Sequence, residues 1–397
     1  MSHQTVYLDY AATSAVRPKE VVDAVARYLT GLGGTPGRGA HRVAADSGRI
    51  ALRCRMALAR LLNLPGDPGR LAFTFNATHS LNTALWGVLR AGDAVVVTAF
   101  DHNSVLRPVH MLARERGVEV RFVPGYTDGS LDEAALDRAL AGARLLVINA
   151  VSNVLGTALP VRELTRRAHD AGALVLVDAA QAVGHLPIDA ERDGFDMLAF
   201  SGHKGLLGPQ GVGCLWVRPG IDVAPLLAGG TGGDSLSPEM PAAYPDHLEA
   251  GTLNGPGIAG LLAGVEFIER QGLDSMRARA TALKQRLREG LLDIPGVRVL
   301  SPASPDGGAI VTFVSNIVDP PTLAGRLDRE FGVLTRAGLH CAPEVHRLIG
   351  TASTGAVRMS IGWATTEADV DSAIDAVASL AGARQMHTGA AIGYGAR

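Results

Sequence analysis

One lysine of this sequence lies where its surroundings would make it reactive. Lys204 ends the motif Ser-Gly-His-Lys at 201–204, and the apolar run 197–200 before it predicts a buried strand that leads into the motif. A desolvated lysine loses basicity, and its amine then acts as a nucleophile or bonds covalently to a carbonyl carbon. The alternative is an ordinary surface lysine beside a glycine-rich turn.

Two further groups would complement such a lysine. Asp178 ends the apolar run 174–177, where a buried carboxylate is unfavourable without a cationic partner. The tripeptide Asn-Ala-Thr at 76–78 opens a predicted helix, whose free N–H groups and positive dipole end favour a phosphate. Simple N-capping by Thr78 is the alternative there. One ligand satisfies the amine, the carboxylate and the phosphate site together, namely pyridoxal 5′-phosphate (PLP).

The elements that would position these groups alternate between strand and helix. Strands are expected at 6–8, 71–75, 94–98, 118–123, 145–150, 173–178, 197–201 and 212–218, and helices at 18–29, 44–62, 77–89, 105–116, 131–140 and 161–171. Continuously apolar strands separated by amphipathic helices predict an α/β fold with a mostly parallel sheet covered on both faces. Ligands of such sheets lie beyond the carboxyl ends of the strands. The candidate site is therefore formed by the residues that follow the strands: Asp101, His102, Asn103, Ser152, Asn153, Asp178, Ala179, Ala180, Gln181, Ser201, Gly202, His203 and Lys204.

The chain of 397 residues is longer than a single core usually supports, so two domains are expected. The stretch 229–257 is rich in Gly, Pro and Ser and predicts an ordered connection, and 261–292 carries two helical patterns. We expect an N-terminal segment at 1–16 that packs with the small domain, a large PLP-binding domain at 17–258, a smaller C-terminal α+β domain at 259–384 and a mobile tail at 385–397.

Together these motifs resemble the class V aminotransferase group of fold-type I PLP enzymes and, within it, the cysteine desulfurase and selenocysteine lyase family. The resemblance runs from Tyr-Leu-Asp-Tyr-Ala-Ala-Thr at 7–13 to Arg-Met-Ser at 358–360. It implies that Lys204 binds the cofactor aldehyde covalently, that Asp178 pairs with the ring nitrogen and that Gln181 reaches the phenolic oxygen. The remaining implied contacts are a ring-stacking His102, Asn153 near cofactor and substrate, and a phosphate site that includes Ala77, Thr78, Ser201 and His203. Taken singly, His102, His203, Gln181 and Asn153 have the alternative of serving turns and strand ends.

The same resemblance places the active site at a homodimer interface. Thr252 matches a phosphate ligand that comes from the partner subunit, and Arg358 matches the arginine that binds the substrate α-carboxylate. A planar guanidinium suits bidentate carboxylate recognition, although a surface arginine at a strand start is the alternative. Arg38 is a second candidate for substrate binding, at the mouth of the site.

One cysteine, Cys341, would determine which reaction the site catalyses. Cys341 lies in a loop bounded by Gly338 and Pro343, and positively charged neighbours favour the nucleophilic thiolate of a cysteine. The loop looks like the Arg-x-Gly-His-His-Cys-Ala loop of one desulfurase subgroup, which places Cys341 at the sulfur-accepting position. Leu339 departs from that pattern, because the subgroup usually has histidine there. A zinc site formed by Cys341, His340 and His346 is the alternative, although no fourth ligand is evident.

Composition excludes several classes of partner. The net charge of −2 provides no basic field for nucleic acid, and no apolar run approaches the ~20 residues of a membrane span. The three cysteines are widely spaced and odd in number, which is typical of a reducing compartment and predicts a cytoplasmic location. Cys54 and Cys214 are interpreted as small apolar core residues.

The resulting hypothesis is a PLP-dependent cysteine desulfurase. It would convert L-cysteine to L-alanine, leave the sulfur on Cys341 as a persulfide and pass it to an acceptor protein. Three alternatives remain at this point: a selenocysteine lyase, another class V reaction such as transamination or carbon–sulfur cleavage, and a non-catalytic protein with the same fold.

Overall fold

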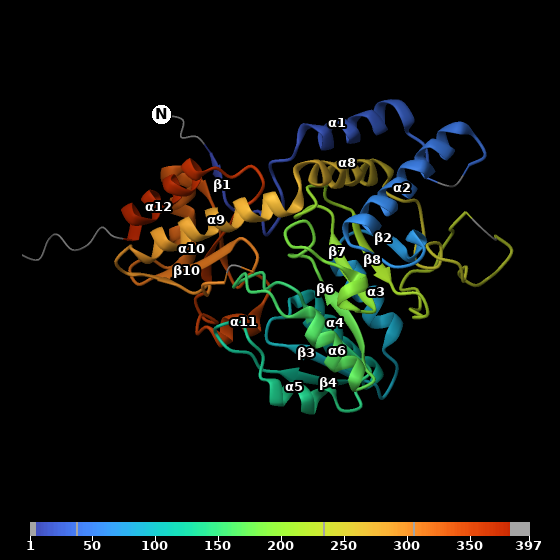
Figure 1. The fold of residues 1–397 in the computed structure, drawn as a ribbon, viewed down its shortest axis with the longest axis horizontal. Helices are drawn as coiled ribbons and strands as arrows, with labels where there is room; N and C mark the ends of the chain where they lie inside the picture. The colour runs from blue at the N-terminus through green and yellow to red at the C-terminus, as the bar shows by residue number, and fades with distance from the viewer. Residues whose placement is uncertain (1–4, 37–38, 233–234, 305, 382–397) are drawn as a thin grey trace, which may run out of the picture.

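The computed structural model describes residues 5–36, 39–232, 235–304 and 306–381, and it contains a large and a small sheet. The large sheet has the strand order β2-β8-β7-β6-β5-β3-β4 (Figure 1). The strands are β2 (Leu71–Thr74), β3 (Ala94–Thr98), β4 (Glu119–Val123), β5 (Leu145–Asn149), β6 (Leu174–Asp178), β7 (Met197–Ser201) and β8 (Gly213–Val217). Only the pairings of β8 with its two neighbours are antiparallel. The predicted α/β fold with a mostly parallel central sheet is confirmed.

Helices cover both faces of this sheet, and every strand except β4 is therefore buried throughout or nearly so. Alternate strand residues pack on opposite sides. One face meets α3 (Ala77–Val88) and α4 (Asn103–Arg116), and the other meets α2 (Arg42–Leu61), α5 (Glu133–Leu140), α6 (Val161–Asp170) and α8 (Gly255–Gln271). Because β3, β4, β5, β6 and β7 run parallel, their carboxyl ends lie at one common edge, where the polar residues that follow the strands collect.

The small sheet has the order β12-β13-β10-β9 and its own apolar core. Its strands are β9 (Val297–Val299), β10 (Ile310–Ser315), β12 (Arg336–Gly338) and β13 (Ala356–Ser360), and α9 (Leu273–Leu292), α10 (Pro320–Phe331), α11 (Pro343–Leu348) and α12 (Glu367–Ala381) accompany them. The N-terminal β1 (Val6–Tyr7) pairs in parallel with β11 (Val333–Leu334) and contacts α12, so it lies in the same half of the molecule as the small sheet (Figure 1).

Helix α8 crosses the predicted domain limit at 258. It packs along α1 (Lys19–Arg27) and α2, beside the large sheet, and α9 then leads to the small sheet (Figure 1). The connection from β8 to α8 holds no helix or strand in its described part. The domain limits stay a prediction, as does the tail at 385–397, which lies outside the described residues. No helix in the described ranges has both the length and the apolar character to cross a membrane.

Candidate active site

A cavity of about 210 Å³ opens at the carboxyl edge of the large sheet. Its wall comes from the ends of strands and the starts of helices that are distant in sequence. It is lined by Asn76, Ala77, Thr78, His102, Ser104, Asn149, Val151, Asn153, Asp178, Ala180, Gln181, Ser201, His203 and Lys204. Most of the predicted site residues are therefore brought together.

Lys204 enters this cavity from a tight turn after β7. Ser14 Oγ donates to the Lys204 carbonyl at 2.8 Å, and the Leu207 amide donates to the same carbonyl at 2.9 Å. Gly205 lies so close to the Val183 carbonyl that a β-carbon would collide with it. Burial lowers the pKa of Lys204 to about 8, although the Asp178 carboxylate acts in the opposite direction. Much of the amine is thus available in its neutral, nucleophilic form near pH 8.

Asp178 ends β6 and is 4% exposed. Its Oδ1 accepts from the Ala180 amide at 3.0 Å. Burial raises the pKa of Asp178, while that hydrogen bond and the positive charge of Lys204 lower it. A buried carboxylate in this position would be stabilised by a cationic nitrogen of a bound ligand.

The start of α3 forms the opposite wall. The Ala77 amide donates to Ser201 Oγ at 2.9 Å, and Asn76 Oδ1 accepts from the His79 amide at 3.0 Å. In the described chain the Thr78 amide has no such partner, so it remains free to bind an anion. His203 Nδ1 lies 3.0 Å from Thr13 Oγ1, and the ring borders the same wall.

The tautomer of His102 follows from its contacts. Its Nδ1 accepts from the Ser104 amide at 3.0 Å, so in the neutral ring the proton is on Nε2. Burial, together with nearby Lys204, lowers the pKa of His102 to about 4. The ring that borders the cavity is therefore neutral at physiological pH.

This neutral ring makes the folded protein sensitive to acid. The imidazole of His102 has an ordinary pKa of 6.5 and a folded-state pKa of about 4, so unfolding takes up a proton between pH 4 and pH 6.5. The folded protein therefore becomes less stable as the pH is lowered through this window. Between pH 7 and pH 4.5 the free energy of unfolding should fall in both proteins. We expect this fall to be about 2 kcal/mol smaller in His102→Gln than in the wild type. Urea denaturation at each pH measures this difference, and identical pH dependence in the two proteins would contradict it.

Two amide side chains of the cavity have buried oxygens that find no hydrogen-bond partner among the described residues. These are Oδ1 of Asn149, at the end of β5, and Oδ1 of Asn153. Asn149 is absent from the sequence-based site, although a polar residue that ends an apolar strand was the available signal. Gln181 directs its Nε2 at the Ala11 carbonyl, at 2.8 Å.

Cys341 lies outside the cavity lining, but the backbone of its loop is hydrogen-bonded to residues at the cavity. The Cys341 carbonyl accepts from the Asn103 amide at 2.8 Å, and the preceding His340 carbonyl accepts from Asn153 Nδ2 at 2.6 Å. The Cys341 side chain is exposed, with Sγ 3.8 Å from a guanidinium nitrogen of Arg336. A thiol on this loop is thus held at the edge of the lysine cavity.

Arg358 is buried on β13 at 1% exposure, directly behind Asn153. Its guanidinium donates to the Asn153 carbonyl at 3.0 Å and to Asp9 Oδ1 at 2.8 Å, while Nε is buried without a partner. Sequence reasoning missed Asp9, since the pairing of β1 with a distant strand gives no local pattern.

Among the predicted catalytic and binding residues, Cys341, Arg358 and Thr252 do not line the cavity, and Thr252 is exposed. Arg38 lies outside the described residues. His340 Nδ1 and His346 Nε2 face each other at 3.2 Å, so they do not share a metal between them. Within the described ranges no group of three or more His, Cys, Asp or Glu side chains is placed to hold a metal ion.

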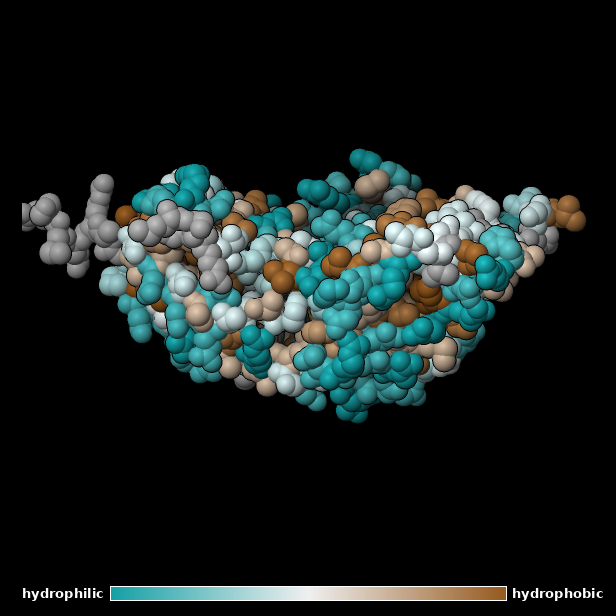
Figure 2. All heavy atoms as spheres, turned by 90° about the horizontal axis from the view of Figure 1, so that it is seen from above, coloured by the Kyte–Doolittle hydropathy of each residue, from teal (hydrophilic) through white to brown (hydrophobic). Residues whose placement is uncertain are grey.

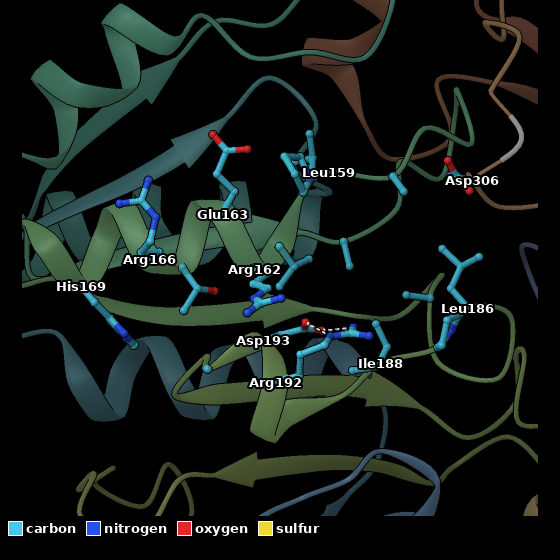
Figure 3. A pocket seen from close by; sticks show the side chains of 18 of the residues that line it. Leu159, Arg162, Glu163, Arg166, His169, Leu186, Ile188, Arg192, Asp193 and Asp306 are labelled. Atoms are coloured by element: carbon cyan, nitrogen blue, oxygen red, sulfur yellow. Dashed lines mark hydrogen bonds and ion pairs between the residues drawn. The ribbon is translucent and has the colours of Figure 1, made fainter.

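A larger hollow of about 960 Å³ lies along α6, as Figure 3 shows. It is lined by apolar side chains such as Leu159, Leu186 and Ile188 and by charged ones such as Glu163 and the ion pair of Arg192 with Asp193 (Figure 3). None of the predicted catalytic or binding residues lines it. The chemistry of the smaller cavity therefore identifies the better candidate.

Comparisons with known proteins agree with this choice. Residues 6–372 match a family model described as Aminotransferase class-V. A probable cysteine desulfurase of Pyrococcus abyssi is 36% identical over 359 residues, which cover 88% of this chain and 88% of that protein. One from Methanothermobacter thermautotrophicus is 34% identical over 384 residues, with 95% of each covered.

Solved structures give the same result for the fold. The apo cysteine desulfurase of Thermococcus onnurineus NA1 superposes with a TM-score of 0.87 at 32% identity, covering 95% of this chain and 94% of that chain. The cysteine desulfurase CsdA of Escherichia coli has a TM-score of 0.83 at 29% identity, covering 94% of each. The arrangement of large and small sheets is thus shared with these enzymes along almost the whole chain.

Proposed function

Because the chain belongs to the class-V aminotransferase family, we propose that it is a PLP-dependent cysteine desulfurase that converts L-cysteine to L-alanine and L-cysteine sulfur to a persulfide on Cys341. The observation that carries the proposal is that two reactive groups lie at the same cavity. Lys204, with its lowered pKa, lines the cavity, and the loop of the exposed Cys341 is hydrogen-bonded to Asn153 of the same lining and to Asn103. The relatives named cysteine desulfurase support the same reaction.

The donor set of the cavity fits PLP. Lys204 offers an amine for the aldehyde, and the buried Asp178 carboxylate offers a partner for the pyridinium nitrogen. The unpartnered Thr78 amide at the start of α3, with Ser201 and His203, offers donors for the phosphate. The neutral His102 ring offers an uncharged face for stacking. When bound, PLP would supply an electron sink for the substrate α-carbon.

The residues of this chain would then do the rest. The Lys204 amine takes the α-proton and later returns it to the α-carbon, so that it acts first as base and then as acid. The Arg358 guanidinium, whose Nε has no hydrogen-bond partner among the described residues, would hold the substrate carboxylate. The Cys341 thiolate attacks the substrate sulfur, so that an S–S bond forms and the Cβ–S bond breaks. Cβ keeps the electron pair and gains one proton, which balances the proton lost from the substrate thiol. The products are alanine and the Cys341 persulfide, which a thiol of an acceptor protein consumes.

A homodimer with a shared site is part of the proposal. Thr252 is exposed in this chain, and so are the apolar side chains of Val22, Leu29, Leu226 and Leu227. Figure 2 views the molecule from the α1 side and shows brown hydrophobic residues among the teal hydrophilic ones on this face. Such a surface favours association with a second copy, whose Thr252 would complete the phosphate site.

Product analysis tests the function directly. PLP-loaded protein incubated with L-cysteine and dithiothreitol is expected to release L-alanine and sulfide in equal amounts. Pyruvate in place of alanine would point to another carbon–sulfur lyase, and alanine from L-selenocysteine alone would point to a selenocysteine lyase. The absence of any product from the PLP-loaded protein would overturn the proposal.

A further inference from the structure

A chain of hydrogen bonds lies behind the Cys341 loop, and the proposed reaction does not use it. His340 Nε2 lies 3.2 Å from the Arg336 carbonyl, and His340 Nδ1 lies 3.2 Å from His346 Nε2. His346 Nδ1 lies 2.7 Å from the Thr351 hydroxyl. His346 is 0% exposed, Thr351 is 2% exposed and His340 is 3% exposed. Buried polar groups connected in this way are costly to leave incomplete.

The direction of every bond in the chain follows from its first member. A carbonyl only accepts, so His340 Nε2 carries the proton and Nδ1 of the neutral ring is an acceptor. His346 must then donate from Nε2, which leaves its Nδ1 to accept from the Thr351 hydroxyl. Burial lowers the pKa of His340 to about 3 and the pKa of His346 to about 4, so both rings are neutral at physiological pH.

The loop needs such support because its backbone is unfavourable. His340 and Cys341 are consecutive non-glycine residues in the left-handed region, with φ of 49° and 58°. Their carbonyls are held by Asn153 Nδ2 and the Asn103 amide, both from the large domain. The His340 ring is held by His346 of α11. The conformation that presents the Cys341 thiol therefore depends on anchors from three separate segments of the chain.

We propose that His346 and Thr351 are positioning residues for the Cys341 nucleophile. Thr351 fixes the tautomer of His346, His346 fixes the tautomer and ring orientation of His340, and His340 holds the left-handed turn that places Cys341 at the cavity edge. The catalytic part of this proposal rests on the proposed desulfurase reaction, whereas its structural part does not.

The test compares His346→Ala with His346→Gln, whose side-chain amide retains a donor toward His340. In His346→Ala, kcat for alanine formation is expected to fall about 10- to 100-fold, since small displacements of a reacting group cost that much. KM for L-cysteine and the absorbance of bound PLP should stay unchanged. His346→Gln should recover most of kcat. If His346→Ala does not fold, Thr351→Val, with Thr351→Ser as its matched control, tests the same chain by an isosteric change.

Hydrogen exchange gives a second readout that needs no activity. The peptide covering 336–349 should exchange about 10-fold faster in His346→Ala than in the wild type and normally in His346→Gln, with no change in α8. Unchanged exchange in this peptide together with unchanged kcat would overturn the positioning role. A wild-type protein without desulfurase activity, but with the expected exchange pattern, would instead refute the proposed reaction and leave the role of the chain in ordering the loop.

Discussion

Replacement of Lys204 by alanine is expected to lower kcat for alanine formation by about 10³-fold or more. The variant loses both the covalent attachment of PLP and the base that moves the α-proton, and positioned general bases alone contribute about 10²- to 10⁴-fold. Alanine release from L-cysteine at saturating PLP measures the loss. Lys19→Ala is the matched control, because Lys19 is exposed on α1 and forms an ion pair with Asp23 on the same helix.

The chain also permits a direct test of the attachment site. It contains only three lysines, Lys19, Lys204 and Lys284. Reduction of the PLP-loaded protein with borohydride, followed by peptide mass spectrometry, is expected to place the pyridoxyl group on Lys204. A label on Lys284, which is on α9 and donates to the Ser304 carbonyl, would contradict the assignment.

The second large effect is expected for Cys341→Ser. We expect kcat with L-cysteine to fall at least about 100-fold, because a serine hydroxyl is not ionised near neutral pH and does not accept sulfur from the substrate. PLP binding should be unchanged, since Cys341 does not line the cavity. Mass measurement should detect one added sulfur atom on Cys341 of the wild type and none on the variant.

The other two thiols provide the control. Cys54 and Cys214 are 0% exposed, and burial raises the pKa of Cys54 to about 12. Iodoacetamide is therefore expected to modify Cys341 alone in the folded protein, with loss of activity. Full activity of Cys341→Ser on L-cysteine would show that the sulfur leaves without this thiol. Activity retained only on L-selenocysteine would assign the protein as a selenocysteine lyase.

Local patterns determined most of the large domain. The apolar runs at 145–150, 173–178 and 197–201 match β5, β6 and β7 to within a residue at each end, since a strand buried on both faces leaves an unmistakable pattern. The relatives with solved structures confirm the class, a PLP-dependent fold of type I. Asp178, Ser201 and Lys204 were predictable because parallel strands deliver the residues after them to one edge. The beginning of α8 at Gly255, inside the expected connection, was missed because Gly and Pro occupy its first turn.

Lys204 is where sequence and tertiary structure divide most clearly. Its motif alone indicated an amine after a buried strand, but its pKa depends on tertiary burial, which lowers it, and on the Asp178 carboxylate from another strand, which raises it. Contacts between residues distant in sequence were equally beyond local pattern: Asp9 with Arg358 is a pairing across 349 residues, and Asn153 with His340 is one across 187. No periodicity records such pairs, because they depend on how distant segments pack in the folded chain. Residue types and their local patterns thus identify the groups that are chemically able to act, whereas the packing of the folded chain brings particular ones among them together.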